Sequence, residues 1–166
     1  NVVPGKNYVP QNKVYIALVQ TDGMGLGAWF RPGRGTIPCS WEVTMNWAWL
    51  APAMRQFFYD QATPNDYFIG SLSGPGYMYP KAIPPALLPA IVDSAYSLMR
   101  QLDLDMFEIM DHSAYWHTDG IDDDLPRDIV DVYFDRMPEV LGIASGYRPG
   151  HTFAVNKGRA FISYDY

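Results

Sequence analysis

The fold is decided by residues Pro84–Asp111, which read PPALLPAIVDSAYSLMRQLDLDMFEIMD. The first part of this segment repeats apolar side chains every three or four residues, as an amphipathic helix does when one face packs on a core. A short break at Asp103–Asp105 leads into Met106–Met110, where the sequence predicts a strand. A helix that leads so directly into a strand is typical of α/β proteins. The apolar stripe of the helix comprises Leu87, Leu88, Ile91, Val92, Ala95, Leu98, Met99 and Leu102.

The same alternation of strands and helices extends along the rest of the chain. We therefore expect an α/β fold with a mainly parallel sheet, forming part of a TIM-like (β/α) barrel. Six strands are too few to close an eight-stranded barrel; an open doubly wound sheet is the alternative. The other expected elements are strands at Val14–Gln20, Glu42–Trp47, Tyr67–Leu72, Val140–Ser145 and Arg159–Ser163, a helix at Ala48–Ala62, and a helix from about Pro126 capped by Asp124.

The lengths of the connecting loops predict where a functional site lies. Loops that enter the expected strands are short, whereas loops that leave them are long. In parallel α/β proteins, ligands bind at the carboxyl ends of the strands, where the leaving loops gather. Long loops at this edge therefore indicate a built site. They span Gly23–Trp41, Ser73–Ile83, His112–Leu125 and Gly146–Lys157.

Composition limits the classes of protein to be considered. The 166 residues are 48% hydrophobic and 18% charged, which is typical of one globular domain and excludes disorder. A net charge of −6 and the lack of a basic tract argue against nucleic-acid binding. No apolar run reaches the ~20 residues of a membrane span. The chain begins at Asn1 without Met and ends as a strand ends. We therefore interpret residues 1–166 as a single α/β domain from a larger catalytic domain, with flanking domains missing.

The most distinctive motif is Gly74-Pro75-Gly76-Tyr77-Met78-Tyr79-Pro80, directly after an expected strand. Proline stiffens such a loop, and glycine permits backbone conformations that other residues avoid. The loop is therefore expected to hold Tyr77 and Tyr79 at the carboxyl edge. Tyrosine rings stack on the apolar face of a sugar and hydrogen-bond through their hydroxyl groups.

This heptapeptide resembles the naming motif of the GxGYxYP family of inferred glycoside hydrolases. The resemblance extends from about the first expected strand to the last. It implies a carbohydrate substrate, a hydrolytic activity, and a secreted or periplasmic location. One departure concerns the turn after the first strand, which reads Asp22-Gly23-Met24-Gly25 here and often Asp-Gly-Asp-Asn in the family. A mechanism that needs two acids in this turn is therefore not expected for this chain.

Glycoside hydrolysis ordinarily uses two carboxyl groups that flank the scissile bond. Asp22 and Asp111 each follow an expected strand at the carboxyl edge, and we predict that they form the catalytic pair. The sequence does not assign the order of the two roles: Asp111 fits the acid slightly better, because aromatic residues and many acids surround it in sequence, and Asp22 then fits the carboxylate. Glu108 is a reserve candidate because it alternates with methionines inside a strand.

Aromatic residues near the ends of the expected strands predict a sugar-binding cleft. No nucleotide-binding glycine fingerprint follows any strand, and no cofactor or bound metal is expected. The predicted substrate-binding residues are Trp29, Asn46, Trp47, Tyr77, Tyr79, His112, Tyr115 and Trp116.

Two other functions remain open from the sequence. One is a metal-dependent glycan deacetylase that uses Asp22, Asp111 and the loop histidines, although His112 and His117 are not spaced as a helical zinc pair. The other is a carbohydrate-binding domain that keeps the aromatic residues and has no catalytic activity.

Overall fold

The structure, a computed structural model, describes residues 7, 9, 11–111, 113, 125–146, 155–156 and 158–163. Its strands form a seven-stranded sheet in the order β1-β2-β3-β4-β5-β7-β6. The elements are β1 (Val19–Gln20), α1 (Leu26–Trp29), β2 (Cys39–Thr44), α2 (Trp47–Leu50), α3 (Pro52–Asp60), β3 (Asp66–Ser71), the 3-10 helix η1 (Pro80–Ala82), α4 (Leu88–Gln101), β4 (Met106–Ile109), α5 (Arg127–Arg136), β5 (Gly142–Ser145), β6 (Val155–Asn156) and β7 (Arg159–Ser163).

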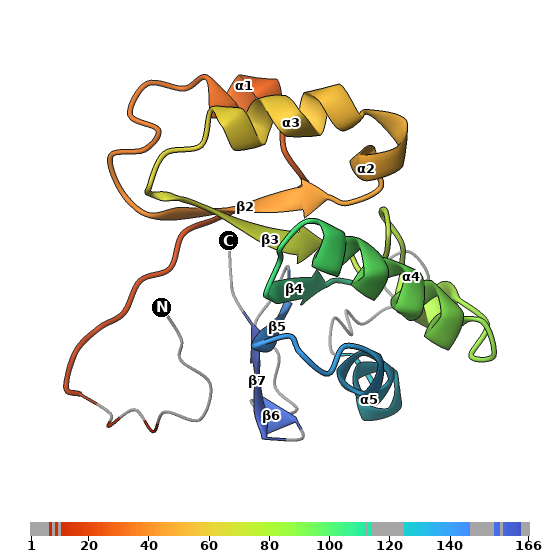
Figure 1. Cartoon of the computed structure of the whole chain (residues 1–166). Coiled ribbons are helices and arrows are strands. Elements are labelled where there is room, and N and C mark those ends of the chain that lie inside the picture. Colours follow the sequence, from red (N-terminus) through yellow and green to blue (C-terminus); the bar gives the residue numbers. More distant parts are fainter. Residues whose placement is uncertain are drawn as a thin grey trace.

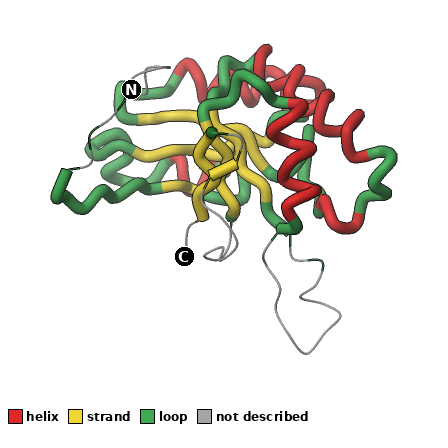
Figure 2. The backbone as a smooth tube through the Cα atoms, turned by 90° about the horizontal axis from the view of Figure 1, so that it is seen from below, coloured by secondary structure: helices red, strands yellow, loops and turns green. Residues whose placement is uncertain are grey.

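Six of the seven strands are parallel, and β1 to β5 lie side by side in chain order. The sheet curls into a half-barrel, and the helices cover its outer, convex face (Figures 1 and 2). The predicted α/β class is therefore confirmed. The antiparallel β6, which pairs with β7, was not expected from the sequence. Among the described residues, no helix has the length and apolar character to cross a membrane.

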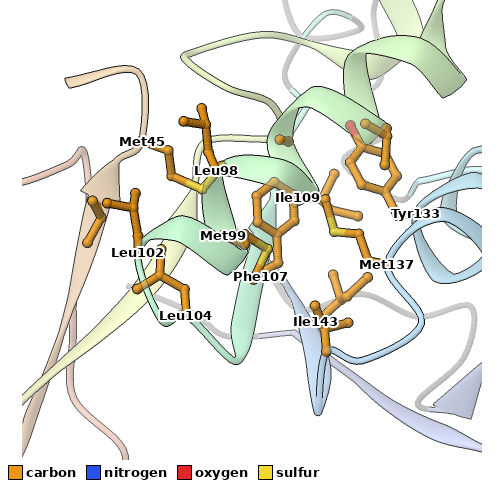
Figure 3. Close-up of a cluster of buried hydrophobic side chains, with 14 of the residues drawn as sticks. Met45, Leu98, Met99, Leu102, Leu104, Phe107, Ile109, Tyr133, Met137 and Ile143 are labelled. Carbon is orange, nitrogen blue, oxygen red and sulfur yellow. The ribbon is translucent and has the colours of Figure 1, made fainter. Parts of the chain in front are cut away.

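The core lies between the sheet and its helices and includes residues of α1 and α3; Figure 3 shows the part beside α4 and α5. Most of the predicted apolar stripe lies on α4 as its periodicity indicated, with Val92, Leu98 and Met99 fully buried against the sheet, whereas Leu87 precedes the helix and is exposed. Hydrophobic burial on this scale is the dominant favourable term in folding. The polar side of α4 faces outward through its exposed residues Asp93, Ser94, Ser97 and Arg100.

The first strand is shorter and more exposed than expected. We predicted a buried strand over Val14–Gln20, but β1 contains only Val19 and Gln20. Val14 and Ile16 are exposed. An apolar run of this length predicts a strand, but it does not show whether other elements of the fold cover that strand.

The helix expected over Ala48–Ala62 is divided into α2 and α3. Pro52 is the first residue of α3, a position where its fixed φ and missing N–H are tolerated. Ala51 adopts an extended φ of −146° and separates the two helices. Pro52, inside the expected helix, was therefore the sequence signal that the helix is divided at this point.

The two faces of the sheet carry different residues because side chains alternate along a strand. Val43 pairs with Gly70, which pairs with Phe107, and these residues face the helices. A methyl group on Gly70 would lie 2.9 Å from the Phe107 ring, so only glycine fits there. The next residues along these strands, including Glu42 and Glu108, therefore face the concave side.

Candidate functional site

The turn after β1 places Asp22 at the carboxyl edge of the sheet. Asp22 and Gly23 have φ values of 65° and 77°, in the left-handed region. A Cβ on Gly23 would lie 2.2 Å from Thr44 Oγ1, so glycine allows the turn to pack directly on the end of β2. The side chain of Asp22 is exposed at this edge.

Beneath this turn lie two buried carboxyl groups, from Glu42 on β2 and Glu108 on β4. Their exposed fractions are 0% and 1%. Burial is the largest cause that raises the pKa of Glu42, to about 10, followed by its hydrogen bond with Glu108 and the negative charge of that residue. Hydrogen bonds from the backbone of Gly23 and Asp22 act in the opposite direction. The Glu42–Glu108 pair therefore keeps one proton at neutral pH.

The pair was only partly anticipated from the sequence, where Glu108 was a reserve candidate and Glu42 had no assigned role. The available signal was a glutamate within each of two apolar strands, at the position that alternates with core residues. That pattern indicates burial, but it does not show that the two carboxyl groups meet across β3.

The GxGYxYP motif forms the loop after β3 and packs against Asn46. The backbone N–H of Asn46 donates to the Pro75 carbonyl at 2.7 Å. A Cβ on Gly76 would lie 2.5 Å from Asn46 Nδ2, and one on Gly74 would lie 2.4 Å from Met78 Sδ. Neither glycine has a positive φ. Our expectation that they supply unusual backbone conformations was therefore wrong, since close packing is what requires them.

The two motif tyrosines form a pair at the surface. Tyr77 is 54% exposed, and its hydroxyl lies 3.3 Å from the hydroxyl of Tyr79. The rings meet edge to face with centroids 5.6 Å apart. An exposed tyrosine edge with adjacent hydroxyl groups offers both stacking and hydrogen bonding to a sugar.

Asp111 follows β4 and is enclosed rather than exposed. Its Oδ2 accepts a 2.6 Å hydrogen bond from the Lys81 backbone N–H, and its Oδ1 accepts 2.8 and 2.5 Å bonds from Ser113 N–H and Oγ–H. Lys81 Nζ lies 3.8 Å from Oδ1, and the Asp111 side chain has no exposed surface. The carboxylate therefore connects the segment after the tyrosine motif to the end of β4.

Ser73 and Tyr133 complete the connection between β3 and β4. Ser73 Oγ donates to the Met110 carbonyl and accepts from the Met110 N–H, each at 2.8 Å. The Tyr133 hydroxyl, on α5, donates to the Ser73 carbonyl at 2.6 Å. Burial, and secondarily the charge of Asp111, raises the pKa of Tyr133. Such saturated buried bonding fixes the loop from which the tyrosine motif projects.

The predicted aromatic site residues divide into distinct groups. Trp29 is 2% exposed and packs edge-on against Trp41 and Phe58 in the core, with the Arg34 guanidinium 4.0 Å from its ring centroid. The structure therefore places Trp29 in the core, away from the exposed residues of the carboxyl edge. Trp47 is half-buried and stacks on Phe58. Three further predicted residues, His112, Tyr115 and Trp116, lie outside the described residues.

The structure thus brings a subset of the predicted residues to one edge. Asp22, the tyrosine motif and Asp111 follow β1, β3 and β4, which are parallel, so all three lie at the carboxyl ends of strands. Within the described part of the chain, no three His, Cys, Asp or Glu side chains are grouped as metal ligands.

The fold and the residues at the carboxyl edge of the sheet define the class of protein. It is an α/β half-barrel with acidic and aromatic residues at the carboxyl ends of its strands. The GxGYxYP putative glycoside hydrolase C-terminal domain matches residues 12–165, and the chain belongs to this family. A similar fold occurs in the crystal structure of a putative hydrolase from Bacteroides thetaiotaomicron, with a TM-score of 0.72 and 17% identity. The match covers 95% of this chain and 31% of that one. No curated protein matches the chain.

Proposed function

We propose that the carboxyl edge of this sheet forms part of the active site of a glycoside hydrolase. The observation that carries the proposal is the placement of an exposed carboxylate, Asp22, at the same edge as the exposed Tyr77 and its half-buried neighbour Tyr79. Family membership supports the substrate class. Because the chain spans 31% of the similar hydrolase, we propose that residues elsewhere in the protein complete the cleft.

Asp22 is proposed as the carboxylate that faces the sugar. Cleavage of an acetal develops positive charge at the anomeric carbon, and a nearby carboxylate stabilises or traps that cation. Asp22 is exposed and lies in a turn whose backbone is fixed by Thr44 and Glu42. The tyrosine pair would bind the sugar rings, with Asn46 supporting the loop from below.

Asp111 was predicted to be one of the two catalytic carboxyl groups, and its surroundings favour a different role. Three hydrogen bonds engage its two oxygens, and its side chain is enclosed. Donation of a proton to a substrate would require Lys81 and Ser113 to release it. We therefore propose that Asp111 positions the segment after the tyrosine motif.

The test is turnover of a panel of oligosaccharides by the protein and by variants. Asp22→Asn should abolish hydrolysis while leaving the fold intact, and Asp60→Asn, an exposed acid on α3, should be neutral. Normal turnover by folded Asp22→Asn would reject Asp22 as the catalytic carboxylate. Loss of activity with a chelator, restored by zinc, would favour the deacetylase-like alternative.

A binding domain without catalysis is the second candidate, because the exposed Tyr77 ring offers a surface for stacking and Asp111 is enclosed. In that case the protein binds oligosaccharides without turnover. Tyr77→Ala would weaken this binding, and Asp22→Asn would not.

A further inference from the structure

We propose that Glu42 is a positioning residue: it connects the Asp22 turn to Glu108 and so fixes the Asp22 carboxylate at the edge of the site. The inference rests on the proposed function for its catalytic consequence. The connection itself is a property of the fold and is open to measurement without a substrate.

The geometry starts from the position of the two glutamates in the sheet. Glu42 lies on β2 and Glu108 on β4, both on the concave face, with β3 between them. On β3 the residue at the level of Glu108 is Ser71, whose small side chain donates its hydroxyl to the Val43 carbonyl at 3.2 Å. The carboxyl groups of Glu42 and Glu108 meet across this strand in a hydrogen bond.

One proton between these groups follows from electrostatics. Two adjacent carboxylates that are both removed from solvent repel each other strongly, so one of them keeps its proton. The groups that act on Glu42 are Glu108 on β4 and the backbone amides of the turn after β1. The proton of the pair lies between Glu42 and Glu108, and Glu42 accepts hydrogen bonds from the backbone N–H groups of Asp22 and Gly23.

This arrangement matters because the Asp22 turn is otherwise unfavourable. Asp22 has a φ of 65°, a conformation that non-glycine residues adopt infrequently. Hydrogen bonds from its own amide and the next one to Glu42 hold it in that conformation. Ionisation of Glu42 would bring a second negative charge against Glu108, separate the two carboxyl groups and loosen the turn.

Glu42→Gln is the informative variant because glutamine mimics the protonated acid. Its amide N–H₂ donates to Glu108, its carbonyl accepts from the turn, and it does not ionise. Glu42→Ala removes the connection. The matched control is Glu139→Gln, which makes the same chemical change at an exposed position beside Tyr96.

The first readout needs no substrate. The amide NMR signals of Asp22 and Gly23 should shift with a common alkaline midpoint in the wild-type protein and in Glu139→Gln. In Glu42→Gln the alkaline shift should be absent. An identical alkaline titration in Glu42→Gln would overturn the proposal, because the titrating group would then not be Glu42.

The second readout is kinetic. Displacement of a catalytic group by about 1 Å costs on the order of 10²-fold, so Glu42→Ala should lower kcat by about that factor. Glu42→Gln should keep near-normal kcat at neutral pH and lose the alkaline decline of the wild-type pH profile. Equal loss of kcat in the Gln and Ala variants would overturn the positioning role.

The two readouts separate this inference from the proposed function. If no oligosaccharide is hydrolysed by any form, the glycosidase proposal fails, and the amide titration still decides whether Glu42 holds the turn. If Glu42→Ala does not fold, the wild-type and Gln comparison alone supports or overturns the proposal.

Discussion

The two faces of the sheet use the same strands for opposite purposes. The convex face presents Val43, Phe107 and Ile143 to the helices, and all three are almost fully buried. The concave face places Glu42 and Glu108 at the positions that alternate with them. A shift of one residue along a strand therefore separates the core from the candidate site.

Burial of side chains has opposite effects on the stability of the fold at the two faces. Burial of apolar side chains on the convex face stabilises the fold at about 25 cal/mol per Å². Burial of a carboxyl group on the concave face is unfavourable, which is what the raised pKa of Glu42 expresses. Proteins commonly keep such groups where position matters more than stability.

The largest expected effect lies on the convex face. Phe107→Ala should lower the free energy of unfolding by ~3–5 kcal/mol, because its ring is fully buried between β4 and α4 (Figure 3) and its removal leaves a cavity. Ile162→Ala on the concave face, 51% exposed, should change it by less than ~1 kcal/mol. Chemical denaturation measures both, and similar losses would break the comparison.

At the carboxyl edge, substitution of Asp22 should have a large effect on activity and little effect on stability. Asp22→Asn should reduce kcat by ~10²–10⁴-fold, the range for a positioned acid–base group. Its unfolding transition should stay near that of the wild type because the side chain is exposed. A variant that loses activity together with its fold would show that Asp22 is structural.

Close packing of the motif loop gives a smaller effect. Gly76→Ala should destabilise the protein by ~1–3 kcal/mol, because the new methyl group overlaps the Asn46 amide. Gly27→Ala is the control, since no atom lies within 4 Å of its added Cβ. If thermal unfolding shows equal shifts for both, the loop accommodates the methyl group and the packing argument fails.

The most gradual effect is the pH dependence of stability, which is spread over several pH units. Glu42 has a pKa of about 10 when folded, against 4.5 for an ordinary glutamate, so between these values the folded state binds one more proton than the unfolded state. Stability from this group is fully present below pH 4.5 and is lost as the pH rises toward 10.

The free energy of unfolding of the wild-type protein should decline by up to ~1.4 kcal/mol per pH unit across this window. Denaturant unfolding at a series of pH values should show that Glu42→Gln removes this decline. Its stability relative to the wild type should rise with pH across this window. Parallel profiles for the two proteins would show that Glu42 is not protonated in the folded state, and Glu139→Gln should follow the wild type.

The sequence predicted most of the elements and the edge that holds the candidate site. The sequence predicted the bounds of several elements to within one to a few residues, because periodicity and turn residues are local signals. These elements are the apolar part of α4 and strands β3, β4 and β7. The burial of Trp29 was not foreseen, because a tryptophan in a leaving loop has the same sequence pattern whether it folds inward or outward. The burial of Asp111 depended in the same way on contacts from Lys81, distant in sequence.

By itself, the sequence determined the α/β alternation, the tyrosine motif with its family resemblance, and the edge where the acids gather. These follow from spacing and residue type, which are properties of neighbouring residues. Only the tertiary structure decided that Glu42 and Glu108 meet, that Asp22 is the exposed acid, and that Gly76 fits against Asn46. Those outcomes depend on the curl and register of strands far apart in the chain, because only a folded sheet brings their side chains within contact.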